Sequence, residues 1–415
     1  MNFVPKKYIL PFILITSLFF IWGFARAVLD VLNKHFQDLL SISITQSAMV
    51  QATTYLGYFL MALPAGIIIT RRGYRRGVVT GLILFAVGAL LFIPGERLLS
   101  FGIFLVALFI IGCGLAMLET AANPYASELG DPATASSRLN LAQSFNGLGC
   151  ILGPVVVGGF LFSGKGGSVA IPYSIMAVAV IIVALIFSKV SLPEIPQRER
   201  DENESENKRE YNNAANKDNT NNNTGNAIGN SIRALWASGF FRLGIFTLFC
   251  YEIAEISINS LFINYVLSAG WMDKSAATAL LSFGALGLFM FARIAGSWIM
   301  SRTPARKVLL VCAIGATLGA ILVSFNWGIF SAIGLFACYA FEAIMFPTIF
   351  AITISGVSGN VKIASSFLMM TPIGGAVGTV LMGMIADNIN ISAAFLIPAI
   401  AYGMVILYTI ISKKN

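Results

Sequence analysis

The chain has 415 residues, of which 57% are hydrophobic and 11% are charged, and its mean hydropathy is +0.80. This composition excludes a soluble globular domain and is typical of a polytopic membrane protein. The formal net charge is +8, but the basic residues are spread between the apolar runs and do not gather into a basic patch with interleaved aromatics, so we expect no nucleic-acid partner.

Several classes of chemistry lack the residues that they need. The five cysteines lie inside apolar runs without a Cys-x-x-Cys pair, which indicates small core residues and no disulfide. His35 is the single histidine, and no Gly-x-x-x-x-Gly-Lys phosphate loop is present. We therefore predict a protein that is not an enzyme and that binds no cofactor.

Twelve apolar runs are long enough to span a bilayer as helices. The first, from Tyr8 to Leu29, is too long for a signal peptide and lacks a cleavage site, so it is expected to remain in the protein. The others are expected at about 46–70, 77–94, 100–126, 138–162, 170–190, 240–268, 275–300, 307–326, 329–356, 362–388 and 391–411. We expect a multi-pass protein of the cell inner membrane, and the distribution of Lys and Arg predicts that both of its termini lie in the cytoplasm.

The chain is expected to divide into two bundles of six helices, at residues 1–192 and 233–415. The polar, Asn-rich segment 193–232 between them is predicted to be a disordered cytoplasmic linker. The halves align at an offset of 225, which matches Asp30 with Glu255 and also matches three glycines, Gly149, Gly153 and Gly158, with Gly374, Gly378 and Gly383. Pseudo-symmetric parallel halves of this kind are the plan of the major facilitator fold, with the substrate between them.

Acidic residues indicate which helices face a polar cavity. A charged side chain at the centre of a bilayer costs roughly 3 kcal/mol or more, so such residues face a pathway. The third, sixth, ninth and twelfth helices carry no acidic or basic residue in their apolar stretches and are expected to face lipid. The first, fourth, seventh and tenth helices carry Asp30, Glu119, Glu252, Glu255 and Glu342, which we predict to act in cation coupling.

The acids of two helices share a face with other polar residues. Arg26 stands one turn before Asp30, and Glu252, Glu255 and Asn259 stand at i, i+3 and i+7. We expect Arg26 and Asn259 to contact substrate. The alternative for Arg26 and Asp30 is an ion pair with a purely structural role.

Uncharged amides form a second polar group. Asn140, Gln143 and Asn146 stand at i, i+3 and i+6 on the fifth helix, beside Asn123 on the fourth. Because an amide both donates and accepts hydrogen bonds, this set predicts binding of a sugar, with Phe346 as an apolar platform. The alternative is hydrogen bonding between helices.

The buried charges do not balance. The five acids face two buried basic residues, Arg26 and Arg293, so full ionisation would leave a net charge of −3. At least one acid is therefore expected to be protonated or to bind a cation. No metal site is certain, but Na⁺ bound by Glu252 and Glu255 is an alternative to H⁺.

Five motifs carry a family resemblance: Phe19–Phe24 with Asp30, Leu118–Pro124, Arg138–Asn146, Phe346–Phe350 and Ser365–Phe367. They resemble the fucose–proton symporter family of sugar transporters, within the major facilitator superfamily, over about residues 8–411 apart from the linker. The resemblance implies that Asp30 and Glu119 couple cation to sugar and that Gln143 and Asn146 bind the sugar.

We therefore expect an all-α secondary transporter that imports a monosaccharide of the fucose or hexose class by alternating access. Its partners would be the sugar, H⁺ in preference to Na⁺, and the lipid bilayer, and it would act as a monomer. The alternatives are a Na⁺-coupled symporter, a sugar exporter or uniporter, and a membrane sugar sensor that does not transport.

Overall fold

The computed structural model describes residues 8–129, 135–161, 168–190, 232–300, 302–356 and 361–411. Within these ranges the regular structure is helical, and twelve helical spans are long and apolar enough to cross a membrane. The predicted all-α fold with twelve transmembrane helices is confirmed. The predicted linker at 193–232 lies outside the described residues except for its last position.

The N-terminal half contains six spans in seven helices. These are α1 (Ile9–Leu40), α2 (Ile44–Ser47), α3 (Met49–Leu90), α4 (Phe92–Arg97), α5 (Phe101–Glu128), α6 (Ala135–Leu161) and α7 (Ala170–Lys189). The α3 segment holds parts of two spans and turns between them at Gly73, whose φ of 80° suits glycine. The predicted loop between the second and third spans is therefore reduced to this turn.

The C-terminal half also contains six spans, and four of them are assembled from shorter helices. The elements are α10 (Gly239–Ser268), α11 (Lys274–Ala279), the π-helix η3 (Leu280–Leu286), α12 (Gly287–Met300), α13 (Ala305–Ser324), α14 (Ile329–Glu342), α15 (Met345–Ser355), α16 (Val361–Leu368), α17 (Ile373–Asn388), α18 (Ile391–Ala394) and α19 (Leu396–Ile411). The breaks after α14 and α16 precede Pro347 and Pro372, because proline cannot donate a backbone hydrogen bond to the preceding turn.

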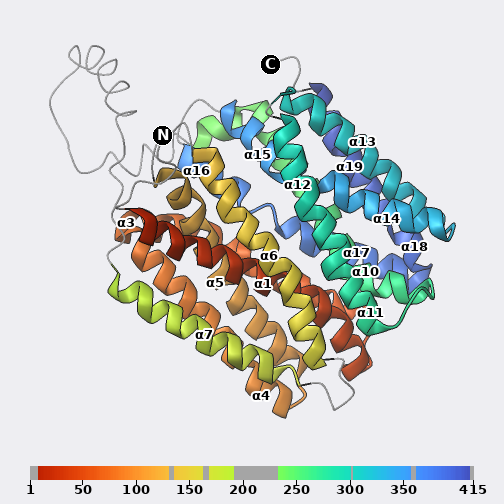
Figure 1. Ribbon diagram of the computed structural model, residues 1–415, viewed down its shortest axis with the longest axis horizontal. Helices are drawn as coiled ribbons and strands as arrows, with labels where there is room; N and C mark the ends of the chain where they lie inside the picture. The colour runs from red at the N-terminus through yellow and green to blue at the C-terminus, as the bar shows by residue number, and fades with distance from the viewer. Residues whose placement is uncertain are drawn as a thin grey trace.

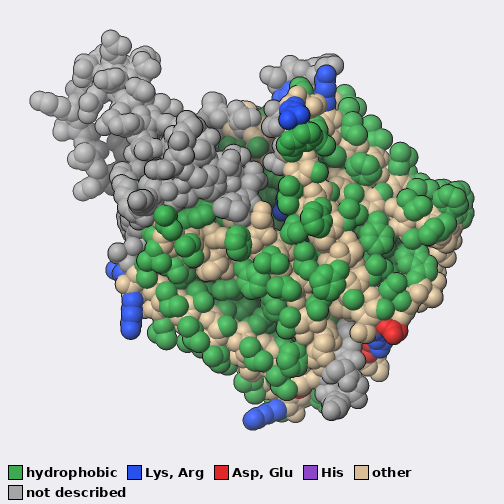
Figure 2. All heavy atoms as spheres, in the orientation of Figure 1, with side chains coloured by type: hydrophobic (Ala, Val, Ile, Leu, Met, Phe, Trp, Pro, Cys, Tyr) green, Lys and Arg blue, Asp and Glu red, His purple; other side chains and the backbone are tan. Residues whose placement is uncertain are grey.

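The two halves lie side by side, with α1 to α7 on one side of the molecule and α10 to α19 on the other (Figure 1). Each half is held by its own pairs, such as α1 with α6, α3 with α5, α10 with α17 and α13 with α14. Hydrophobic side chains cover most of the visible outer face, as expected for a surface in contact with lipid (Figure 2). On α7, for example, Ile171, Ile175 and Leu185 are exposed.

Glycines in equivalent positions confirm the internal repeat. A Cβ atom at Gly149 of α6 would collide with the backbone of Phe20 and Phe24 on α1, and one at Gly374 of α17 would collide with the backbone of Phe249 on α10. Phe249 is the residue that aligns with Phe24 at the offset of 225. Both halves therefore use glycine to bring the first and fifth helices into close contact.

The first helix is longer than predicted. It continues eleven residues beyond the apolar run that ends at Leu29, to Leu40, and it carries Asp30, as predicted, together with Asn33. The helix continues because its later polar residues pack against the other half of the protein, where Asn33 Nδ2 donates to Ser260 Oγ at 2.6 Å and Asn264 Nδ2 donates to Gln37 Oε1 at 2.7 Å.

The halves also meet around the C-terminal end of α1. Lys274 Nζ lies 2.6 Å from a carboxylate oxygen of Asp38. The carboxylate of Asp387 accepts hydrogen bonds from the backbone nitrogens of Ile44 and Thr45 at 3.1 and 2.8 Å. These contacts join the two bundles at this end of the molecule.

Candidate functional site

A cavity of about 490 Å³ lies between the two bundles, within the size range of small-molecule sites. Its polar lining includes Arg26, Asp30, Tyr55, Tyr58, Glu119, Gln143, Ser144, Asn146, Tyr251, Glu252, Glu255, Asn259 and Arg293. The lining comes from the first, second, fourth, fifth, seventh, eighth, tenth and eleventh spans. None of the described lining residues comes from the third, sixth, ninth or twelfth spans, which were expected to face lipid.

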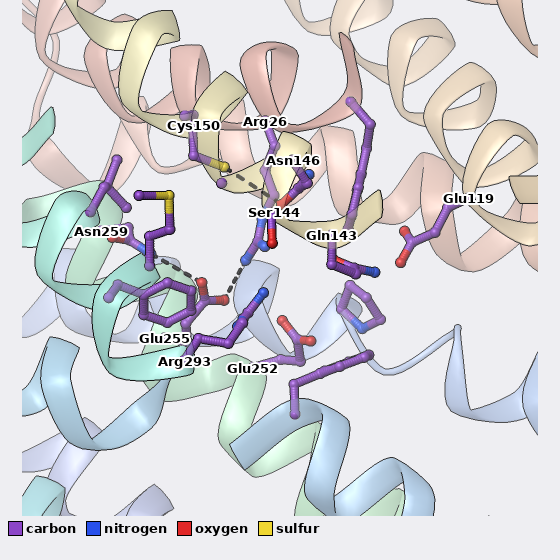
Figure 3. A pocket seen from close by; sticks show the side chains of 18 of the residues that line it. Arg26, Glu119, Gln143, Ser144, Asn146, Cys150, Glu252, Glu255, Asn259 and Arg293 are labelled. Atoms are coloured by element: carbon purple, nitrogen blue, oxygen red, sulfur yellow. Dashed lines mark hydrogen bonds and ion pairs between the residues drawn. The ribbon is translucent and has the colours of Figure 1, made fainter. Parts of the chain in front are cut away.

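An ion pair between the bundles stands at the centre of the site. Arg26 Nη2 of α1 donates to Glu255 Oε2 of α10 (Figure 3). Arg26 Nε also donates to the hydroxyl of Tyr55 at 3.2 Å, and Asn259 Nδ2 donates to Glu255 Oε1 at 3.2 Å. Both carboxylate oxygens of Glu255 are therefore engaged, and the pair joins the two halves across the cavity.

Asp30 is buried beside this pair but has a different partner. Its Oδ1 accepts a hydrogen bond from Gln51 Nε2 at 2.9 Å, and its exposed fraction is 7%. Arg26, one turn earlier on α1, forms its ion pair with Glu255. Arg26 therefore forms its ion pair with the other half of the protein, and not with Asp30 as the structural alternative expected.

The predicted amide group is partly assembled at the cavity. Gln143 lines it and donates from Nε2 to Asn123 Oδ1 at 3.3 Å, so Asn123 positions the Gln143 side chain. Asn146 also lines the cavity, but its Nδ2 donates to the carbonyl of Phe19 at 3.3 Å and thus also joins α6 to α1. The side chain of Asn140 lies outside the described part of the structure.

Glu119 and Glu252 both line the cavity, from α5 and α10 respectively. Glu119 is half-buried, and Glu252 is 4% exposed. Nearby, Arg293 donates from Nε to the carbonyl of Ala343 at 2.9 Å, and its guanidinium lies 4.6 Å from the centre of the Phe289 ring.

Glu342 is not where the sequence placed it. It was expected to face the cavity, but it is fully buried inside the C-terminal bundle, where Oε2 accepts a hydrogen bond from the hydroxyl of Tyr402 on α19. The reason is the break after α14, which ends at Glu342. Phe346, at the start of α15, lines the cavity instead, as predicted for that residue.

Sequence reasoning missed the contribution of the second span. Gln51, Tyr55 and Tyr58 of α3 contact Asp30, Arg26 and Trp22, and the two tyrosines line the cavity. Their spacing of i, i+4 and i+7 places them on one helix face. This spacing inside an otherwise apolar run was the signal that could have identified them.

Comparison with known proteins places the chain in a family. The sequence profile of the Major Facilitator Superfamily matches residues 12–367. The chain is 32% identical to the L-fucose-proton symporter of Escherichia coli strain K12, over 97% of this chain and 93% of that protein. It is also 32% identical to a glucose/galactose transporter of Brucella abortus, over 99% and 96% of the two chains.

Solved structures agree with this placement. The crystal structure of FucP, a major facilitator transporter in the outward conformation, matches with a TM-score of 0.73 and 32% identity, over 98% of this chain and 99% of that chain. The D-xylose-proton symporter matches with the same TM-score at 12% identity, over 97% and 96% of the two chains, and so shares the fold. These matches confirm the expectation of a transporter and not an enzyme. The chain belongs to the major facilitator superfamily.

Proposed function

We propose that this protein imports a monosaccharide together with a proton across the cell inner membrane. The observation that carries the proposal is the cavity between the bundles, which is lined both by the amide of Gln143 and by the acids Asp30 and Glu119. The proteins that it resembles over nearly their full length are named as fucose–proton and glucose/galactose transporters. We also propose that the protein acts as a monomer.

The sugar would be held mainly by uncharged groups. Gln143 and Asn146 can donate to and accept from sugar hydroxyls, with Asn123 orienting Gln143. Trp22 and Phe346 also line the cavity and offer apolar faces for the C–H side of a pyranose ring. This combination of amides and aromatic rings suits a polyhydroxylated ligand of small size.

The proton would be carried by Asp30 or Glu119. Both are carboxyl groups at membrane depth with access to the cavity, and Asp30 is bonded to a neutral amide while the neighbouring arginine is paired elsewhere. Sodium at Glu252 and Glu255 would have to displace Arg26 or Asn259 from Glu255. We therefore favour the proton over sodium.

Transport would proceed by alternating access, with residues 1–192 and 233–415 moving as two bodies connected by the linker at 193–232. The positive-inside rule supports a cytoplasmic location for both termini. In that orientation the contacts of Asp38 with Lys274 and of Asp387 with Thr45 close the extracytoplasmic end.

The test is transport by the purified full chain in proteoliposomes. We expect counterflow of at least one of radiolabelled fucose, glucose and galactose, and a sugar-induced current that varies with pH at constant sodium. A current that requires sodium at constant pH would transfer the coupling role to Na⁺. Counterflow without current under either gradient would indicate a uniporter, and sugar binding without counterflow would indicate a sensor.

A further inference from the structure

Glu252 differs from Asp30 and Glu255, the other deeply buried acids of the cavity, because it has no hydrogen bond or ion pair with any described residue. Its side chain is 4% exposed and lines the cavity, where it points toward the same space as Gln143 (Figure 3). Within the described ranges, its carboxylate takes part in neither a hydrogen bond nor an ion pair. Burial of an ionised carboxylate is unfavourable unless a hydrogen-bond donor or a cation pairs with it.

The other acids are already accounted for. Glu255 is bound by Arg26 and Asn259, and Asp30 accepts from Gln51. Glu342 lies outside the cavity with Tyr402. Glu119, with Asp30, belongs to the proposed proton site.

Within the described part of the chain, no second cation pairs with Glu252. Arg26 is paired with Glu255. Arg293, the other arginine of the cavity, donates to a backbone carbonyl and stacks on Phe289, and it lies beyond ion-pair distance of Glu252. Glu252 is therefore left to interact with whatever occupies the cavity.

The total charge of the cavity leads to the same conclusion. Its lining includes four acids (Asp30, Glu119, Glu252, Glu255) and two arginines (Arg26, Arg293), which gives a net charge of −2 when all are ionised. One coupled proton reduces this to −1. Closing the cavity removes water, and a buried charge without a counter-charge is then strongly unfavourable.

A neutral sugar can donate a hydroxyl to Glu252 but cannot cancel its charge, whereas an ammonium group does both through a charge-assisted hydrogen bond. We propose that the preferred cargo is an amino sugar, a monosaccharide with a protonated primary amine, whose ammonium binds Glu252 while its hydroxyls bind the amides of Gln143 and Asn146. This inference rests on the proposed function and narrows its substrate class.

The test compares sugars that differ only at the amine, in counterflow by the full-length protein in proteoliposomes. D-glucosamine is compared with D-glucose and with N-acetyl-D-glucosamine, in which the amine is uncharged, and D-galactosamine is compared with D-galactose. We expect counterflow to reach half of its maximal rate at a concentration of amino sugar at least tenfold lower than the concentration of its neutral counterparts that is required. In Glu252→Gln this preference should fall at least tenfold, whereas Glu342→Gln, which removes a buried carboxyl outside the cavity, should retain it.

Measurements of sugar binding to the wild-type protein test the proposal even if a variant fails to fold. Trp22 and Trp298 line the cavity, so quenching of tryptophan fluorescence reports binding of each sugar to the unaltered protein. Equal affinity for the amine and the neutral sugar would overturn the proposal, and so would a preference that persists in Glu252→Gln. A sugar-induced current that carries two charges per neutral sugar would assign a second proton to Glu252 and also overturn it. Absence of counterflow with every sugar would instead reject the proposed transport function.

Discussion

The carboxylate of Asp387 accepts two hydrogen bonds from Thr45, one from its backbone nitrogen at 2.8 Å and one from its hydroxyl at 2.6 Å. Asp387 lies at the end of α17 and Thr45 lies in α2, so the contact joins the two bundles across 342 positions of sequence. A contact that joins the bundles at one end must break when they separate there. It therefore stabilises one conformation of the transport cycle relative to the other.

Replacing Asp387 should shift the protein toward the conformation that is open at this end. Asp387→Ala removes charge-assisted hydrogen bonds and should cost the closed conformation roughly 1–2 kcal/mol, or about tenfold in population. Spin labels at Leu39→Cys and Ile389→Cys, in a chain without the native cysteines, would report the distance between the bundles. Asn388→Ala is the matched control, because Asn388 donates within its own helix to Met384. An unchanged distance distribution in Asp387→Ala would show that the contact does not hold this end closed.

The ion pair between Arg26 and Glu255 should show strong coupling in a double-mutant cycle. Arg26→Leu leaves a buried carboxylate without its cation and should destabilise the protein by about 3–5 kcal/mol. Arg26→Leu combined with Glu255→Leu should recover part of the loss, because no uncompensated charge remains. Thermal unfolding in detergent measures all four proteins. Additive losses would contradict a direct pair.

Asp30→Asn should separate coupling from binding. The amide can keep a hydrogen bond with Gln51 but cannot release a proton, so accumulation driven by a proton gradient should be abolished while sugar exchange continues. Concentrative uptake and counterflow in the same proteoliposomes make the comparison. Full concentrative uptake by Asp30→Asn would remove Asp30 from the coupling site.

Gln143→Ala should weaken sugar binding without affecting folding. Loss of the amide leaves sugar hydroxyls unpaired and should reduce the binding free energy by roughly 1–3 kcal/mol. Calorimetric titration measures the change. Thr317→Ala serves as a control, since Thr317 bonds only to Ala313 of its own helix, in α13 away from the cavity. Wild-type affinity in Gln143→Ala would assign that side chain to helix packing.

The amino-acid sequence by itself determined the twelve spans, the two halves and most of the acids at the cavity. Hydropathy specifies spans because the bilayer requires about 20 apolar residues per helix. The offset of 225 specified which helices are equivalent, and close glycine contacts at Gly149 and Gly374 follow from it.

Partners across the cavity were decided only by the tertiary structure. Arg26 and Asp30 are one turn apart and suggested a local pair, but the rotation of α1 against α10 brings Arg26 to Glu255. Glu342 carries the same local signal as Glu119, yet the helix break that follows it leaves its carboxyl with Tyr402. Spacing along a helix defines which residues share a face, whereas the element that the face meets depends on how the helices pack.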